Sequence, residues 1–188
     1  MGGGKSKVTG GGGTEFHLGD DDSVLYKGRA ELTQTEIDYL NQYSIMSGTP
    51  NSYLRYPKKL SSLENLDVIK NGIPAIDSAI ARSSLDKSIY VYRTMDMKYL
   101  PKNLSVGVSF SDKAFNSTSL FRSEAEKFKA TSGQSIMAKI LVPSGKGKGI
   151  YISDIAGAQN QKEFLIKRNA KYKIMGRGSD GTLYLQMM

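Results

Sequence analysis

The chain has 188 residues, of which 39% are hydrophobic and 23% are charged, as is usual for one globular domain. It contains no cysteine and a single histidine, His17, so disulfide frameworks, thiolate nucleophiles and cysteine-ligated metal sites are excluded. No apolar run approaches the roughly 20 residues of a membrane-spanning helix. Any enzymatic chemistry must therefore depend on carboxylates, hydroxyls, amides and arginines.

The net charge of +8 belongs to the second half of the chain. Residues 1–100 carry 12 basic and 12 acidic side chains, whereas residues 101–188 carry 14 and 6. A basic half attracts polyanions such as nucleic acid, a phosphorylated cofactor or an acidic partner. Lysines scattered over a solvated surface would give the same count, and both interpretations stay open at this point.

The first 19 residues hold 8 of the 20 glycines, which predicts a flexible head. We place its end at residue 22, before a single domain over residues 23–188, and interpret Asp20–Asp22 as a solvated linker. The head lacks the apolar core of a secretory signal, so we expect synthesis in the cytoplasm and action in the cytoplasm of a target cell. Met1-Gly2 with Ser6 also fits the N-myristoylation pattern.

Three helices are predicted in the first half of the chain. Thr33 and Glu36 have the spacing of a capping box, and the apolar residues that follow continue a helix to about residue 48. A second helix is predicted over residues 51–60, ended or bent by Pro57, and a third over residues 73–80. The N-terminal part of the domain is therefore expected to be a helical lobe.

The sequence becomes rich in β-branched and aromatic residues after residue 88. Strands are predicted over residues 88–93, 106–110, 114–120, 135–142, 149–152, 163–166, 171–175 and 183–187, with a short helix over residues 122–129. Helices followed by many short strands predict an α+β fold, with the helical lobe preceding a two-sheet antiparallel β-sandwich core.

Three short segments carry the candidate chemistry: Arg93 near the end of one strand, Ser117-Thr118-Ser119 on another, and Gln161-Lys162-Glu163 at the start of a third. In this order they resemble the Arg-Ser-Glu class of bacterial mono-ADP-ribosyltransferase toxins, in particular the Rho-inactivating clostridial exoenzyme and binary actin-modifying branch. Asn51-Ser-Tyr-Leu-Arg55 is similar to the Asn-x-x-Leu-Arg signature of that family. The resemblance covers roughly residues 30–175 and implies the ADP-ribosyltransferase fold.

The resemblance implies NAD as co-substrate and assigns a role to each segment. Cleavage of the nicotinamide–ribose bond builds positive charge on the ribose, which a carboxylate can stabilise. Glu163 is the candidate for this role, and Ser117 is expected to hold Glu163 in position. Gln161 is expected to bind the nucleophile of the acceptor. In the family, Gln at this position accompanies asparagine targets and Glu accompanies arginine targets, so the chain is expected to modify Asn or Gln and to hydrolyse NAD weakly.

The remaining candidates are expected to bind NAD itself. Arginine is always charged and offers planar donors, which suits Arg93 and Arg55 to the pyrophosphate. Asn51 is expected to contact NAD as in the family signature, Thr118 to line the site, and Phe128 to stack on nicotinamide.

The expected partners follow from the same resemblance. They are NAD and a protein acceptor, which could be a small GTPase or another host protein, while metal and nucleic acid are not expected and the chain is expected to be a monomer. The stretch 154–160 lacks the aromatic residue of the Rho-modifying branch, which argues against Rho itself. Two alternatives stay open: a basic nucleic-acid-binding module, and an inactive structural or phage-associated member of the fold.

Overall fold

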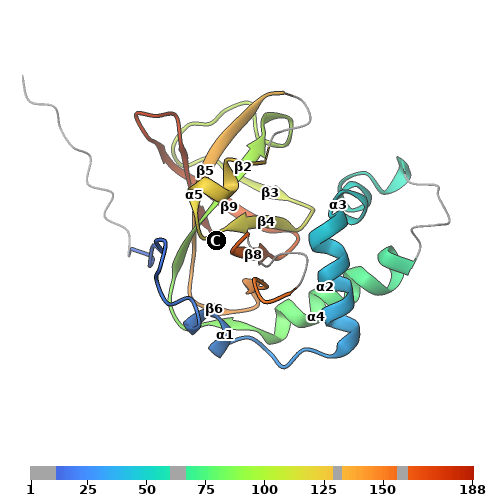
Figure 1. The fold of residues 1–188 in the computed structure, drawn as a ribbon. Coiled ribbons are helices and arrows are strands. Elements are labelled where there is room, and N and C mark those ends of the chain that lie inside the picture. Colours follow the sequence, from blue (N-terminus) through green and yellow to red (C-terminus); the bar gives the residue numbers. More distant parts are fainter. Residues whose placement is uncertain (1–11, 60–66, 129–132, 156–160) are drawn as a thin grey trace, which may run out of the picture.

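The computed structural model describes residues 12–59, 67–128, 133–155 and 161–188 (Figure 1). Helices α2, Gln34–Met46, α3, Gly48–Arg55, and α4, Ile73–Arg82, lie together on one side of the molecule. The strands lie on the other side, and short helices α1, Val24–Lys27, and α5, Arg122–Ala125, flank them. The predicted α+β class, with a helical lobe ahead of the strands, is confirmed.

The helices begin and end where local chemistry dictates. Thr33 caps α2: its hydroxyl accepts a hydrogen bond from the Glu36 amide, and the Glu36 carboxylate accepts one from the Thr33 amide. The second helix lies over residues 48–55 instead of 51–60, because Pro57 cannot continue it and begins the 3₁₀ turn η1, Pro57–Lys59. A π-helical turn, η3, Val68–Gly72, leads into α4. None of the helices in the described ranges could cross a membrane.

The main sheet has eight strands in the order β3-β9-β10-β5-β2-β4-β8-β7. Their bounds are β2, Ile89–Asp96; β3, Ser109–Asp112; β4, Asn116–Ser119; β5, Ser135–Val142; β7, Gly149–Tyr151; β8, Glu163–Ile166; β9, Ala170–Arg177; and β10, Leu183–Met187. A separate two-stranded sheet joins β1, Ser84–Leu85, to β6, Gly145–Lys146, and the 3₁₀ turn η4, Met97–Tyr99, follows β2.

Pairing in the main sheet is antiparallel except between β10 and β5, which run parallel. The strands expected in two antiparallel sheets are thus joined by hydrogen bonds into one mixed sheet. The joining strand is β10, which returns from the end of the chain to lie between β9 and β5. Its partner β5 is far away in the sequence, and no local pattern specifies such a pairing.

Strand β8 is buried on both faces. Phe164 and Ile166 pack in the core enclosed by the sheet, together with Ile89 of β2. Leu165 points the other way and belongs to the second core with Leu40 of α2. Hydrogen bonds to β4 and β7 occupy both edges of β8. The first residue of β8, Glu163, is therefore held by a rigid element.

The second half of the predicted head lies against the domain. Thr14 forms a parallel bridge to Ile89 of β2, and its amide donates to the Ser88 carbonyl at 2.8 Å. Phe16 is buried in the sheet core, and Asp22 accepts a hydrogen bond from the Tyr151 hydroxyl of β7. These contacts add residues 12–22 to the packed part of the chain, whereas residues 1–11, with the myristoylation pattern, lie outside the described residues.

Candidate active site

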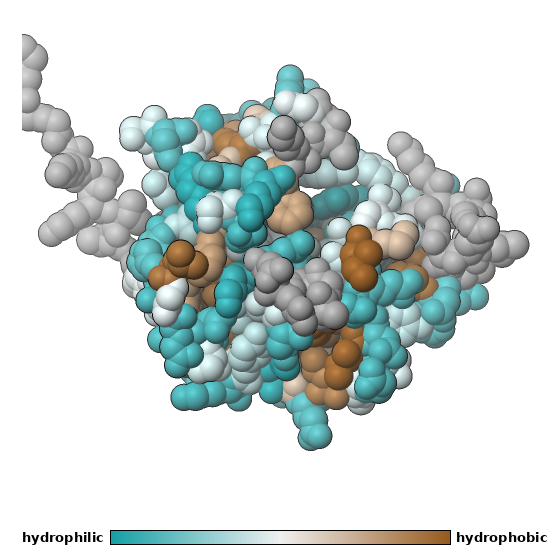
Figure 2. Space-filling view, in the orientation of Figure 1, coloured by the Kyte–Doolittle hydropathy of each residue, from teal (hydrophilic) through white to brown (hydrophobic). Residues whose placement is uncertain are grey.

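A cleft of ≈ 430 Å³ lies where helices α2 and α3 meet strands β2 and β4 and the start of β8. Every candidate residue of the sequence analysis lines it: Asn51, Arg55, Arg93, Ser117, Thr118, Phe128, Gln161 and Glu163. The cleft opens on a mostly hydrophilic surface, on which apolar side chains form small separate patches (Figure 2). The structure thus brings together segments that are far apart in the chain.

Strand register explains why these segments meet. Tyr92 of β2 lies opposite Ser119 of β4, and Ser119 lies opposite Glu163 of β8. Because side chains alternate along a strand, Ser117 shares a face with Ser119 and so with Glu163. Strand β4 therefore lies between the strand that carries Arg93 and the strand that carries Glu163.

The hydroxyls of Thr118 and Ser119 hold the neighbouring segment in place. Thr118 donates to the Phe164 carbonyl at 2.6 Å, and Ser119 donates to the Gln161 carbonyl at 2.7 Å. The hydroxyl hydrogen of Thr118 is thus used within the sheet, so the structure shows this residue supporting β8, while its contact with NAD stays a prediction. Ser119, the third residue of the candidate Ser117-Thr118-Ser119 segment, anchors the turn ahead of Glu163.

Glu163 is an almost fully buried carboxyl group at the floor of the cleft, with 3% of its surface exposed. Burial raises its pKa to about 7, although the Ser117 hydroxyl and the Arg93 charge both act to lower it. The group is therefore close to half ionised at neutral pH. A hydrogen-bond donor placed against it would favour the ionised form.

Three buried side-chain atoms of the described residues have no hydrogen-bond partner: Asn51 Oδ1, Arg93 Nε and Glu163 Oε1. All three residues line the cleft. The rest of each side chain is held, since Asn51 Nδ2 donates to the Tyr43 hydroxyl at 2.8 Å and Arg93 Nη1 donates to the Ser117 carbonyl at 2.7 Å. Unpaired buried polar atoms are rare because each one lowers stability. Their concentration here indicates a ligand that offers both hydrogen-bond donors and an anionic group.

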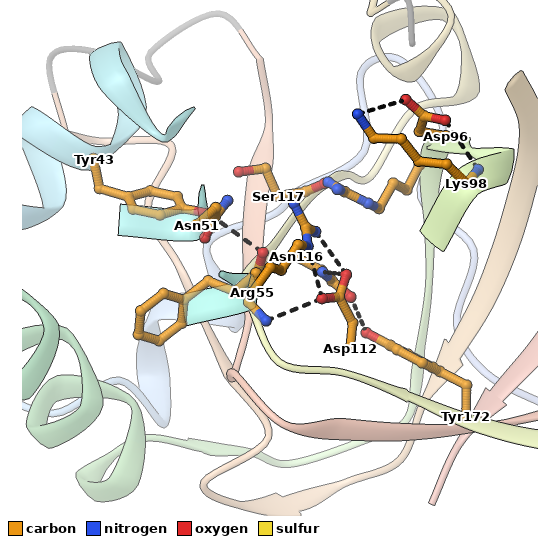
Figure 3. A network of polar contacts seen from close by, with 12 residues as sticks. Tyr43, Asn51, Arg55, Asp96, Lys98, Asp112, Asn116, Ser117 and Tyr172 are labelled. Carbon is orange, nitrogen blue, oxygen red and sulfur yellow. Dashed lines mark hydrogen bonds and ion pairs between the residues drawn. The ribbon is translucent and has the colours of Figure 1, made fainter. Parts of the chain in front are cut away.

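Tyr43 itself belongs to the core beneath the cleft. Its ring packs against Phe115 at 5.7 Å between centroids, and burial raises its pKa to about 12. Its hydroxyl fixes the amide of Asn51, so that the Asn51 oxygen is the atom left free (Figure 3).

Arg55 lines the cleft but is tied to the protein. Its Nε and Nη2 donate to the two carboxylate oxygens of Asp112 at 3.0 and 2.7 Å, and its guanidinium lies 4.0 Å from the centroid of the Tyr99 ring. Burial acts to raise the pKa of Asp112, but Arg55 outweighs it and holds that pKa below its usual value. The predicted contact between Arg55 and the pyrophosphate would use the side of the guanidinium that Asp112 leaves open.

The sequence analysis missed Asp112, the carboxylate partner of Arg55. It also accepts a hydrogen bond from Asn116 at 2.9 Å, and Asn116 in turn accepts one from Tyr172 at 2.6 Å (Figure 3). Residues 111–113 were expected to form the turn between two strands, whereas Asp112 ends β3. A buried arginine is stabilised by a carboxylate partner, so a partner for Arg55 could be expected from the sequence. The spacing of residues in the sequence does not identify which carboxylate it is.

Two candidates stand at the edge of the cleft. Gln161 is half-buried directly before β8, and Phe128 follows α5 with 51% of its surface exposed. Stacking of Phe128 on nicotinamide stays a prediction. Residues 156–160, part of the stretch expected to precede the acceptor-binding glutamine, lie outside the described residues.

Comparison with known proteins identifies the family. The model of the ADP-ribosyltransferase exoenzyme family matches residues 23–185. The chain belongs to this family. As a member it is an ADP-ribosyltransferase domain, and NAD is the co-substrate. An NAD(+)–arginine ADP-ribosyltransferase of Enterococcus faecalis is 31% identical over 107 residues, which cover 55% of this chain and 21% of that relative. The match thus spans about a fifth of that curated relative.

Solved structures show the ADP-ribosyltransferase fold. An ADP-ribosyltransferase from Clostridium botulinum superposes with a TM-score of 0.69 at 20% identity, over 94% of this chain and 98% of that one. A protein from S. aureus, solved with NAD, gives a TM-score of 0.69 at 19% identity over 88% and 92% of the two chains. An ADP-ribosyltransferase toxin from Paenibacillus larvae gives 0.65 at 21% identity over 84% and 87%. The predicted fold and the resemblance to the exoenzyme branch are confirmed.

Proposed function

We propose that this exoenzyme domain transfers ADP-ribose from NAD to a side-chain amide of a target protein, and that it hydrolyses NAD slowly without an acceptor. The observation that carries the proposal is the set of unpartnered buried atoms in one cleft: Asn51 Oδ1, Arg93 Nε and Glu163 Oε1. NAD offers ribose hydroxyls and a carboxamide as donors and a pyrophosphate as an anion. The three atoms match this combination.

Each residue has a distinct task in the proposed reaction. NAD supplies the ADP-ribosyl group: its bond to nicotinamide breaks while a bond to the acceptor nitrogen forms. Nicotinamide leaves as a neutral molecule, and the acceptor nitrogen releases one proton to water. Ionised Glu163 accepts a hydrogen bond from a ribose hydroxyl and places negative charge beside the carbon under attack. Arg93, fixed by the Ser117 carbonyl, directs its free Nε toward the phosphates. Asn51 Oδ1 accepts a hydrogen bond from NAD.

Gln161 supports an amide acceptor. A glutamine side chain can donate to and accept from an amide, whereas it carries no charge to pair with a guanidinium. Arginine remains the second candidate because the Enterococcus faecalis relative bears that activity in its name. Glu163 is the nearest carboxylate along the chain to Gln161, and the proposed reaction already uses it.

We propose a protein of a target-cell cytoplasm as the acceptor, with a small GTPase as the first class to test. The support is the structural likeness to the clostridial exoenzymes from Clostridium botulinum and Clostridium limosum. A whole-cell lysate offers such proteins together, so the acceptor need not be known in advance.

The test combines a whole-cell lysate, NAD labelled in its ADP-ribose part, and variants of Gln161 and Glu163. We expect a labelled protein band that Glu163→Ala abolishes and that Glu163→Gln lowers by about a hundredfold or more. Gln161→Ala should lose the band and keep nicotinamide release, while Gln161→Glu should shift labelling toward arginine. A band that resists hydroxylamine, which releases arginine-linked ADP-ribose, supports the amide acceptor. The absence of both label and nicotinamide release in several lysates would refute the proposal.

A further inference from the structure

The turn Gln161-Lys162-Glu163 has an unusual backbone. Lys162 has a φ of 48°, in the left-handed region that is uncommon for residues other than glycine. A residue in this region persists only when its surroundings hold it there. On the inner side, the Ser119 hydroxyl binds the Gln161 carbonyl, and the Leu120 amide donates to the Lys162 carbonyl at 3.0 Å.

On the outer side, the turn is held by the segment that precedes the first helix. The Lys162 ammonium lies 2.9 Å from Asp22 Oδ2, and the Tyr151 hydroxyl donates to the same oxygen at 2.5 Å. Burial acts to raise the pKa of Asp22, but these two hydrogen bonds outweigh it and hold the pKa below its usual value. Asp22 is therefore an ionised acceptor shared by Lys162 and by strand β7.

Helix α1 and the residues after it hold the chain where it leaves β7. Arg29 donates to both carboxylate oxygens of Asp154, at 2.6 and 2.7 Å, and to the Tyr151 carbonyl at 3.1 Å. The Tyr26 ring packs on the Tyr151 ring at 4.9 Å between centroids. Residues 22–29 thus contact both ends of the connection between β7 and β8.

Gln161 depends on these contacts more than Glu163 does. Glu163 is the first residue of β8, which is paired with β4 and β7 and buried on both faces. Gln161 lies outside the strand, and the structure shows its carbonyl held by the Ser119 hydroxyl. A change in the conformation of Lys162 would therefore move Gln161 first.

We propose that Asp22 is a positioning residue for transfer to protein, which acts by holding Lys162 and so aiming Gln161 at the acceptor. This inference rests on the proposed function. It predicts that NAD binding and NAD hydrolysis, which use Glu163, Arg93 and Asn51, are independent of Asp22. A purely structural role would instead lower all activities together.

The test compares Asp22→Ala with Asp21→Ala in the full chain. Asp21 is the matched control, because it lies in the same acidic run and its side chain forms local hydrogen bonds with Ser23, two residues further on. Three quantities are measured: label transfer to lysate protein, nicotinamide release without lysate, and the dissociation constant of NAD by calorimetry. Misplacement of a positioning group reduces rates strongly, so Asp22→Ala should lower transfer about tenfold and leave hydrolysis and NAD affinity within about twofold.

Lys162→Met provides the independent check. It should reproduce the loss of transfer, and the double variant with Asp22→Ala should show no further loss, since the two residues act through one contact. If Asp22→Ala does not fold, Asp22→Asn removes the charge at constant size and should give a smaller loss of the same kind. Unchanged transfer, or an equal loss of transfer and hydrolysis, overturns the inference alone. A wild-type protein without either activity overturns the proposed function and this inference with it.

Discussion

Burial of the Glu163 carboxyl group should cost the protein stability at the pH where the enzyme works. The pKa of Glu163 is raised from 4.5 to about 7, so between these values the folded protein holds a proton that the unfolded chain has released. Stability therefore falls as the pH rises through this range. Replacement by glutamine keeps the shape and removes the ionisation, so Glu163→Gln should be more stable than the wild type at pH 8.

The magnitude follows from the two pKa values. The carboxyl group has a pKa of about 7 in the folded protein and 4.5 in the unfolded chain. Its ionisation in both states therefore lowers the free energy of unfolding by about 3 kcal/mol. Between pH 5 and pH 8 the free energy of unfolding should fall by about 2–3 kcal/mol through this group, because the unfolded group is already partly ionised at pH 5. No reduction for solvent screening is made to this free energy, because only 3% of the surface of Glu163 is exposed.

Urea unfolding at pH 5 and pH 8 measures this directly. The free energy of unfolding of Glu163→Gln minus that of the wild type should increase by about 2–3 kcal/mol between the two pH values. All other titrating groups are common to both proteins and cancel in the comparison. Glu126→Gln, at an exposed carboxylate, is the control and should show a far smaller change. A difference that stays constant with pH, or that shrinks toward pH 8, would refute the reasoning.

Two further predictions concern activity and the Arg55 anchor. The kcat/KM for nicotinamide release should rise with pH through about 7 and level off above it, because ionised Glu163 is the active form; a rate that is flat between pH 6 and pH 8 would contradict this. Asp112→Ala leaves the half-buried Arg55 without its carboxylate and should lower the free energy of unfolding by about 3 kcal/mol in urea. The same variant should weaken NAD binding in calorimetry, and unchanged affinity would show that NAD binding does not depend on the pairing of Arg55 with Asp112.

Local chemistry made much of the fold predictable. The capping box of Thr33 and Glu36 set the start of α2, and short runs of apolar and aromatic residues gave β5, β8 and β10 with the correct bounds. These features depend on neighbours within a few residues, which the sequence displays directly. Asn51, Arg93 and Glu163 were also named in advance, because their segments resemble the motifs of the family in the same order.

Contacts between distant segments were decided by the tertiary structure. Three such contacts join residues that no spacing rule connects. They are the insertion of β10 between β9 and β5, the ion pair between Arg55 and Asp112, and the ion pair between Asp22 and Lys162. In the sequence, Asp22 is one of three consecutive aspartates with nothing to distinguish it. Only its contacts with Tyr151 and Lys162 in the folded protein do so. The pKa of Glu163 belongs to the same group of properties. The sequence by itself determined that a carboxylate is present, while desolvation between β4, β7 and the helices determined how strongly it holds its proton.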